Sequence, residues 1–246
     1  MVIDFHTHLL PGIDDGSRNA SMTEAMLREE AAQGVSLVAA TPHFYPNRMS
    51  VEGFLERRAA AMECAEQIRR NADDPLPEIV CGAEVFYFRG IGQAKMTPQL
   101  CIGSTETLLL ELPFEQWESP ILEDIRSLLA SGLQVVLAHV ERYFPLQRSR
   151  EVWNSVMALP VMKQLNAGSF LKPSGLSGLL AANRTRAFCL DFLRDHPETM
   201  IGSDCHNLTG RKPNLAAARE VISARLGAEC LSRADQAVLA ALGLQE

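Results

Sequence analysis

The chain has 246 residues, a formal net charge of −7, and hydrophobic residues at 47% of its positions. This length suits one large α/β domain or two small ones, and the apolar content is sufficient for a sizeable core. The negative charge argues against a general nucleic-acid-binding protein, because contacts to phosphate require clustered Lys and Arg.

The sequence begins with MVIDFHTHLLPGIDDG, in which polar residues alternate with apolar ones. Alternate residues of a strand share a face, so Asp4, His6 and His8 are expected on one side, about 7 Å apart between neighbours. Two imidazoles spaced in this way can bind one divalent metal. The turn that follows brings Asp14 and Asp15 as further oxygen donors. For the histidine pair alone, an ordinary strand with two polar residues beside a loop is an equal alternative.

Helices and strands are expected to alternate along the rest of the chain. A helix over 21–33 is indicated by a capping box of Ser21 and Glu24 and by Gly34 after its last turn. A continuous small-apolar run predicts a strand at 35–40, and further strands are expected at 78–85, 107–112, 134–140, 161–166 and 199–203. Further helices are expected at 51–71, 121–131, 152–159 and 179–195, and from residues 213 and 232. Seven β/α units predict one α/β domain over residues 1–246, with a barrel-like parallel sheet.

Side chains that can bind a metal gather at or near the ends of these predicted strands. They are His6, His8, Asp15, His43, Glu84, Glu111, His139, Asp204 and His206. In parallel α/β folds the carboxyl ends of the strands carry the chemistry. A carboxylate such as Glu111, embedded in an apolar run, is costly unless it is paired or metal-bound. Each residue alone could be an ordinary polar side chain, but the convergence of all nine favours a metal site.

Five motifs of the sequence carry a resemblance to a known superfamily. They are D-F-H-T-H-L-L-P-G-I-D-D-G at 4–16, T-P-H at 41–43, G-A-E at 82–84, A-H-V-E-R-Y at 138–143 and S-D-C-H-N-L-T-G-R at 203–211. The set resembles the polymerase-and-histidinol-phosphatase (PHP) superfamily, and most closely the manganese-dependent protein tyrosine phosphatases of bacterial capsule and exopolysaccharide synthesis. This resemblance implies a distorted, TIM-like seven-stranded (β/α) barrel with two or three divalent ions at the strand ends.

The resemblance also implies a role for each candidate residue. It divides the ligands among three metals: His6, His8, Glu84 and Asp204 for the first; a bridging Glu84 with Glu111 and His139 for the second; and Asp15, His43 and His206 for the third. Arg142 and Arg211 are implied to bind the substrate phosphate. Residues 44–50 and 114–119 match the family less well, so the substrate contacts of these two loops stay open.

The chemistry follows from these roles. Mixed imidazole and carboxylate ligands suit Mn²⁺, which is the metal we expect, or Fe²⁺ or Zn²⁺. A hydroxide that bridges the metals is expected to attack phosphorus in line, while Arg142 and Arg211 fork onto the equatorial oxygens. A phenolate leaving group, with a pKa of about 10, needs less protonation than an alkoxide, although Asp14 or a metal-bound water could serve as the acid. The expected partner is a phosphotyrosine-bearing protein, an autophosphorylated bacterial tyrosine kinase.

Four other interpretations each fit part of the sequence. Cys205 and Arg211 have the C-x₅-R spacing of thiol phosphatases, but Cys205 should face away from the flanking ligand candidates. A histidinol phosphatase or another small-molecule phosphoesterase is the nearer alternative. An inactive binding module would lack several of the nine ligands. Amidohydrolases also begin with H-x-H, but they usually need a lysine at a strand end, and no predicted strand here ends in one.

The six cysteines are far apart and form no C-x-x-C motif. Together with a start that enters directly into a strand, this spacing favours a reducing compartment over a secreted disulfide scaffold. No basic segment precedes an apolar one, and no run of 18 apolar residues exists. The sequence therefore predicts a cytoplasmic protein without membrane insertion or nucleic-acid binding.

Overall fold

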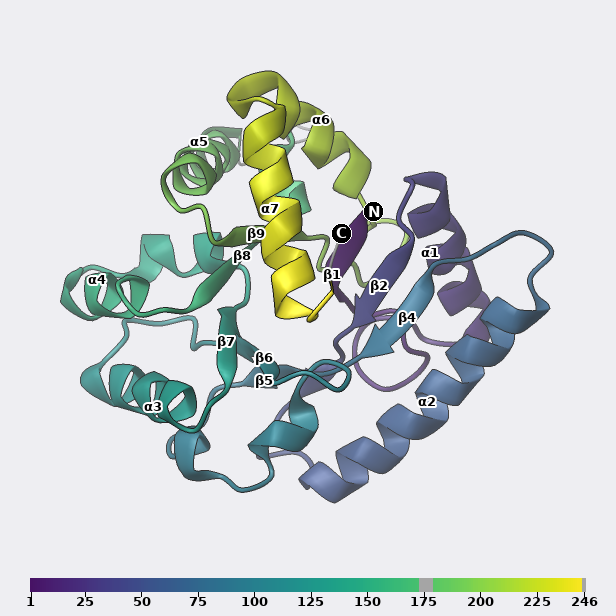
Figure 1. The fold of residues 1–246 in the computed structure, drawn as a ribbon, viewed down its shortest axis with the longest axis horizontal. Helices are drawn as coiled ribbons and strands as arrows, with labels where there is room; N and C mark the ends of the chain where they lie inside the picture. Colours follow the sequence, from purple (N-terminus) through teal and green to yellow (C-terminus); the bar gives the residue numbers. More distant parts are fainter. Residues whose placement is uncertain (173–178, 245–246) are drawn as a thin grey trace.

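The structure, a computed structural model, describes residues 1–172 and 179–244. Strands and helices alternate along the chain (Figure 1). The strands are β1 (Ile3–Thr7), β2 (Leu37–Ala40), β3 (His43–Phe44), β4 (Glu78–Cys81), β5 (Glu84–Phe86), β6 (Thr107–Glu111), β7 (Gln134–Leu137), β8 (Met162–Asn166) and β9 (Thr199–Gly202). The α-helices are α1 (Ala20–Ala32), α2 (Val51–Asn71), α3 (Ser119–Ala130), α4 (Glu151–Met157), α5 (Leu179–Asp195), α6 (Leu215–Leu226) and α7 (Ala228–Ala241).

Hydrogen bonding divides the strands into two parallel sheets. One sheet has the order β1-β2-β4 and the other the order β3-β5-β6-β7-β8-β9. Helices α1 and α2 lie beside the first sheet, and α3, α4 and α5 lie along the second (Figure 1). The parallel α/β architecture is therefore confirmed. The closed seven-stranded barrel is not, because the described residues contain nine strands in two sheets.

Of the two additional strands, one arises where a predicted strand breaks and the other, β3, lies just beyond a predicted strand. The apolar run at 78–85 is divided into β4 and β5, and β3 follows β2 after a short gap. β4 pairs with β2, whereas β5 pairs with β3 and β6, so the two halves belong to different sheets. The break falls at Gly82, where a Cβ atom would lie 2.6 Å from Cγ1 of Ile102. Only glycine therefore allows the chain to pass this close to Ile102.

Local side-chain contacts fix the starts of the first two helices. α1 begins after Asn19, whose side chain accepts a hydrogen bond from Met22 N at 3.0 Å. The predicted capping box is therefore wrong, because Ser21 lies inside the helix and Glu24 pairs with a helix arginine. The bounds predicted for α2 are confirmed, and Ser50 caps it. Within the described part of the chain, no helix has both the length and the apolar composition to cross a membrane.

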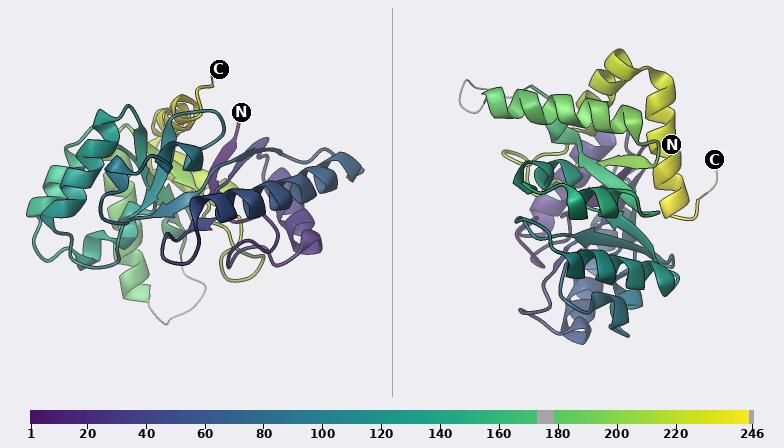
Figure 2. Two further views of the ribbon diagram at one scale, coloured as in Figure 1. Left: turned by 90° about the horizontal axis from the view of Figure 1, so that it is seen from below. Right: turned by 90° about the vertical axis from the view of Figure 1, so that its left-hand side faces the viewer.

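The two sheets approach each other where β1 meets the end of β9. Thr7 forms a parallel bridge with Cys205, and the amide of Asp204 donates to the carbonyl of His6 at 2.8 Å. Helix α7 packs across β9 and β1, and its yellow ribbon lies near the N-terminus of the chain in both views of Figure 2. This junction brings the loops that follow β1 and β9 side by side.

Candidate metal centre

Four polar side chains from both sheets meet in a buried cluster at this junction. The Nε2 atoms of His6 and His8 are 3.1 Å apart, and Glu84 Oε2 lies 3.2 Å from each. Asp204 Oδ1 lies 3.6 Å from His6 Nε2 and 3.4 Å from His8 Nε2. Glu84 is the first residue of β5, and Asp204 follows β9. The four donor atoms are close enough to bind one metal ion.

Glu84 also faces a second group of donors. His43 Nδ1 lies 2.9 Å from Glu84 Oε2 and 3.9 Å from Glu111 Oε2. His139 Nε2 lies 2.8 Å from Glu84 Oε1 and 3.5 Å from Glu111 Oε1. The resemblance assigns Glu84, Glu111 and His139 to this group, and the structure places His43 beside them. The two oxygens of Glu84 thus face different histidines, as a bridging carboxylate requires.

A third group lies nearer the surface. His8, His43 and His206 bring ring nitrogens within 4.8 Å of one another. Asp15 Oδ1 lies 3.6 Å from Nε2 of both His43 and His206, and its side chain is 69% exposed. The resemblance assigns Asp15, His43 and His206 here, and the structure adds His8. All nine residues singled out from the sequence therefore lie in one connected cluster.

The cluster fits divalent cations by the chemistry of its donor atoms. Glu84 Oε2, Asp204 Oδ1, His43 Nδ1, His139 Nδ1 and His206 Nε2 are buried and make no hydrogen bond of acceptable geometry with the described residues. Leaving buried polar atoms unsatisfied costs free energy, which a bound cation would offset. The donors are nitrogen and oxygen without sulfur, a set that suits Mn²⁺, Fe²⁺ or Zn²⁺.

The electrostatics of the cluster hold two of its donors, Glu84 and His206, in metal-binding states. Burial alone would raise the pKa of Glu84, but the imidazoles of His6, His139 and His43 hold it well below the usual range. Burial and the neighbouring His8 lower the pKa of His206 to about 3. Glu84 is therefore an anion and His206 a neutral imidazole near pH 7, and these are the forms that bind metals.

Asp14 orients two of the histidines. Its Oδ2 atom accepts from His8 Nδ1 at 2.7 Å and from the amide of His43 at 2.9 Å. Burial opposes ionisation, but the His8 charge lowers the pKa of Asp14 to about 2. Asp14 is therefore ionised near pH 7 in this arrangement, and its carboxylate accepts both hydrogen bonds. It resembles the carboxylates that fix the tautomer of metal-binding histidines.

Two residues of β8 support the site and were not found from the sequence. Gln164 Oε1 lies 3.2 Å from His6 Nδ1 and accepts from the amide of His139 at 2.7 Å. Asn166 Nδ2 donates to Asp204 Oδ2 at 2.8 Å. Their spacing places both on the same face of a strand that leads to the site. This i, i+2 spacing is the signal in the sequence that could have indicated them, but many strands carry Gln and Asn that support no metal site.

The backbone is strained at two of the candidate ligands. Among the described non-glycine residues, His139 (φ 31°) and Asp204 (φ 54°) have positive φ. Such conformations cost about 1–3 kcal/mol each and concentrate at functional sites. Gly16, the glycine of the D-D-G motif, packs so closely that a Cβ atom there would lie 2.1 Å from the carbonyl oxygen of His8. The turn that carries Asp15 therefore requires glycine at this position.

Both predicted phosphate-binding arginines reach the rim of the centre beside Asp204. Arg211 NH2 lies 2.6 Å from Asp204 Oδ2, and Arg142 NH1 lies 3.9 Å from the same atom. The guanidinium carbon of Arg142 is 4.4 Å from the centre of the Phe114 ring. Both arginine side chains are about two-fifths exposed, so their charges are open to an incoming anion.

Cys205 lies between two candidate ligands but faces the other way. Its sulfur is fully buried and lies 3.6 Å from Glu30 Oε1 of α1. Burial, followed by the charges of Glu30 and Asp4, raises the pKa of the Cys205 thiol well above its ordinary value. The thiol is therefore neutral and inaccessible, and a cysteine-dependent mechanism does not fit this geometry.

The fold and the donor cluster define a class: a parallel α/β protein with a candidate multi-metal centre at the carboxyl ends of its strands. Residues 2–236 match the family described as "Capsular polysaccharide synthesis, CpsB/CapC", and the chain belongs to this family.

Similar proteins carry an enzymatic name. The tyrosine-protein phosphatase CpsB of Streptococcus pneumoniae is 25% identical over 93% of this chain and 92% of its own length. The tyrosine-protein phosphatase YwqE of Bacillus subtilis is 27% identical over 93% of this chain and 86% of its own. A solved structure, from work describing YwqE and CpsB as unique metal-dependent tyrosine phosphatases, has a TM-score of 0.81 at 24% identity. It covers 99% of this chain and 96% of that chain, and therefore supports the fold.

Proposed function

We propose that the chain is a metal-dependent protein tyrosine phosphatase, a phosphoric monoester hydrolase. The observation that carries the proposal is the convergence of nine nitrogen- and oxygen-donor residues, Glu84 among them, in one cluster with Arg142 and Arg211 at its rim. Phosphoryl transfer needs positioning and charge neutralisation more than covalent chemistry, and this arrangement supplies both. Membership of the CpsB/CapC family and the names of its relatives support the choice of phosphotyrosine.

The ligand assignment, the metal and the barrel are parts of the same proposal. We assign two or three ions, Mn²⁺ first, to the nine residues, with Glu84 as the bridge. We also infer that β2 with β3, and β4 with β5, are halves of interrupted strands in a single distorted barrel domain over residues 1–246. In support, one core cluster combines Ile3 and Phe5 of the first sheet with Leu109 and Val136 of the second.

Each part of the mechanism can be assigned to residues of this chain. Divalent ions at the centre would supply Lewis-acid charge and make a water nucleophilic at neutral pH. Arg142 and Arg211 bind the phosphoryl oxygens and orient the ester for in-line displacement. Asp14 holds the His8 ring, and the phenolate leaves without a dedicated acid because its pKa is about 10.

The proposed partner is a phosphotyrosine-bearing protein, an autophosphorylated tyrosine kinase of capsule or exopolysaccharide synthesis in the bacterial cytoplasm. The family description, which names capsular polysaccharide synthesis, supports this assignment. The expected product is the dephosphorylated tyrosine and inorganic phosphate.

A substrate comparison with metal control tests the function. The purified protein should be assayed on phosphotyrosine and phosphoserine peptides and on histidinol phosphate, before chelation, after chelation, and after addition of Mn²⁺, Fe²⁺ or Zn²⁺. We expect the highest kcat/KM on phosphotyrosine, loss on chelation and restoration by Mn²⁺. Preference for histidinol phosphate would instead establish the small-molecule alternative, and full activity after exhaustive chelation would overturn the metal mechanism.

A further inference from the structure

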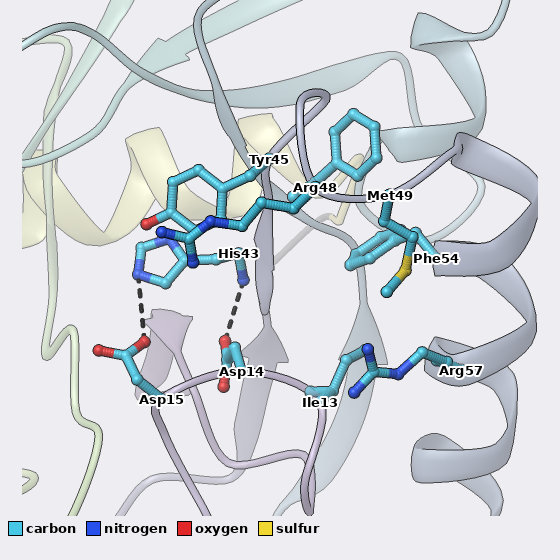
Figure 3. A pocket seen from close by; sticks show the side chains of 10 residues that line it. Ile13, Asp14, Asp15, His43, Tyr45, Arg48, Met49, Phe54 and Arg57 are labelled. Atoms are coloured by element: carbon cyan, nitrogen blue, oxygen red, sulfur yellow. Dashed lines mark hydrogen bonds and ion pairs between the residues drawn. The ribbon is translucent and has the colours of Figure 1, made fainter.

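A cavity of about 470 Å³ lies directly beside the candidate metal centre. It is bounded by the turn that carries Asp14 and Asp15, by the loop after β3, and by the first turns of α2 (Figure 3). Its size lies within the range of about 300–1,000 Å³ that small-ligand sites occupy. Part of its wall belongs to residues 44–50, one of the two loops that match the PHP superfamily poorly in sequence.

The cavity has apolar walls and a cationic opening. Ile13, Met49 and Phe54 supply apolar surface, and Arg48 and Arg57 supply charge. Neither arginine has a carboxylate within 4.0 Å in the part of the chain that the structure describes. The Arg48 guanidinium lies 4.5 Å from the centre of the Tyr45 ring, and Arg57 donates to the carbonyl of Gly12 at 3.2 Å. Figure 3 shows Arg57 extending from α2 toward Ile13 and Arg48 lying beside Tyr45 and His43.

The two acidic residues of the cavity do not neutralise these arginines. Asp14 is bound to His8 and to the amide of His43, and Asp15 faces His43 and His206. Figure 3 shows the contacts of both carboxylates with His43. The two carboxylates are thus held by histidines of the metal centre, whereas the guanidinium groups of Arg48 and Arg57 are available to pair with a ligand. A ligand that enters the cavity therefore meets positive charge next to apolar surface.

The cavity is continuous with the metal centre through His43 and Asp15, which belong to both. A phosphotyrosine held at the centre would place neighbouring residues of its peptide over the cavity opening. We propose, on the basis of the proposed function, that this cavity is a specificity subsite for an acidic side chain near the phosphotyrosine. The methylene groups of this acidic side chain contact the apolar walls of the cavity, and its carboxylate pairs with Arg48 and Arg57.

A glutamate scan of phosphotyrosine peptides locates this contact. In a neutral host peptide, Glu is placed in turn at positions on either side of the phosphotyrosine, and each Glu peptide is compared with its Gln counterpart. We expect one position at which Glu raises kcat/KM about 5- to 30-fold, the effect of one charge-assisted contact discounted for solvent exposure. This gain should appear mainly in KM, because the carboxylate contact is the same in the ground and transition states.

Two variants and a matched control assign the preference to the cavity. The Glu/Gln ratio of kcat/KM should fall toward one in Arg48→Gln and Arg57→Gln. In Arg57→Glu, a peptide with Lys at the same position should have a higher kcat/KM than the Glu peptide. Arg70→Gln should leave the ratio and the activity unchanged, because Arg70 lies at the other end of α2 and pairs with Glu63. The ratio is internally normalised, so a partial loss of folded protein does not alter it.

The outcomes separate this inference from the function on which it rests. If the wild type hydrolyses no phosphotyrosine peptide, the proposed function is wrong and the subsite falls with it. If hydrolysis is efficient but no position prefers Glu, only the subsite is wrong. A Glu preference that survives unchanged in both Arg48→Gln and Arg57→Gln also overturns the subsite, because another surface then reads the carboxylate.

Discussion

Arg142 offers the sharpest test of how the site holds phosphate. Its side chain is 42% exposed, 3.9 Å from Asp204 Oδ2, and its guanidinium lies 4.4 Å from the Phe114 ring centre. A unit charge at about 4 Å interacts by about 1 kcal/mol in water and about 4 kcal/mol at the surface of a protein. With a dianionic ester and a half-exposed arginine, the loss in Arg142→Ala should be about 2–4 kcal/mol. That loss corresponds to about 30- to 1,000-fold in kcat/KM.

The shape of the cationic side chain at position 142 matters as well as its charge. Arg142→Lys should also lose activity, because lysine lacks the planar fork for two phosphoryl oxygens and stacks less well on Phe114. Steady-state kinetics on a phosphotyrosine peptide distinguish the two modes of binding. A contact that tightens in the transition state lowers kcat, whereas uniform binding raises KM alone. Arg148→Ala, an exposed arginine further along the same loop, is the matched control and should be near wild type.

Arg211 requires separate interpretation because it contacts Asp204 Oδ2 at 2.6 Å. Removing it also frees a candidate metal ligand, so Arg211→Ala should alter metal affinity, which Arg142→Ala should not. The phosphate-clamp hypothesis fails if both alanine variants keep kcat/KM within a few-fold of the wild type and bind inorganic phosphate as tightly. In that case the metals alone hold the phosphate.

Three further predictions concern the metals, the thiol and a buried acid. Cys205→Ser should keep most activity while chelation abolishes it; inactivation by iodoacetamide with no effect of exhaustive chelation would contradict the metal mechanism. Glu84→Gln should lose at least one metal ion per folded chain, because the bridge loses its charge between two cations; unchanged metal content and turnover would refute the bridge. Burial, followed by the charge of Asp4, raises the pKa of Glu30 well above its ordinary 4.5. The folded protein therefore binds this proton more tightly than the unfolded chain and loses stability as pH rises above about 4.5. The free energy of unfolding, measured with urea, should rise in Glu30→Gln relative to wild type as pH increases above about 4.5. A difference in unfolding free energy between the two proteins that does not change with pH would show that Glu30 is not a buried neutral acid.

The strand ends could be predicted because apolar runs have visible limits. His43, His139 and Asp204 each follow such a run, and parallel strands carry their carboxyl ends to one edge. The break at Gly82 could not be predicted, because the residues on either side of it are equally apolar. The close approach of Ile102 to Gly82 is a contact between segments distant in sequence. Hydrophobicity marks where a strand can exist, but not which sheet it joins.

Asp4 shows, within the site itself, that a local sequence pattern does not fix which side chains meet. Alternation placed it on the face of His6 and His8, but it belongs to none of the three donor groups. The pairing of β1 with β2 shifts register between Asp4 and Thr7, and an irregularity of this kind interrupts the alternation of faces. Asp4 Oδ1 instead accepts from the amides of Ser203 and His6, at 2.8 and 3.2 Å. Because Ser203 immediately precedes Asp204, this carboxylate ties the end of β9 to β1. It thereby fixes the spacing between a ligand from one sheet and a ligand from the other, a function that no local pattern in the sequence indicates.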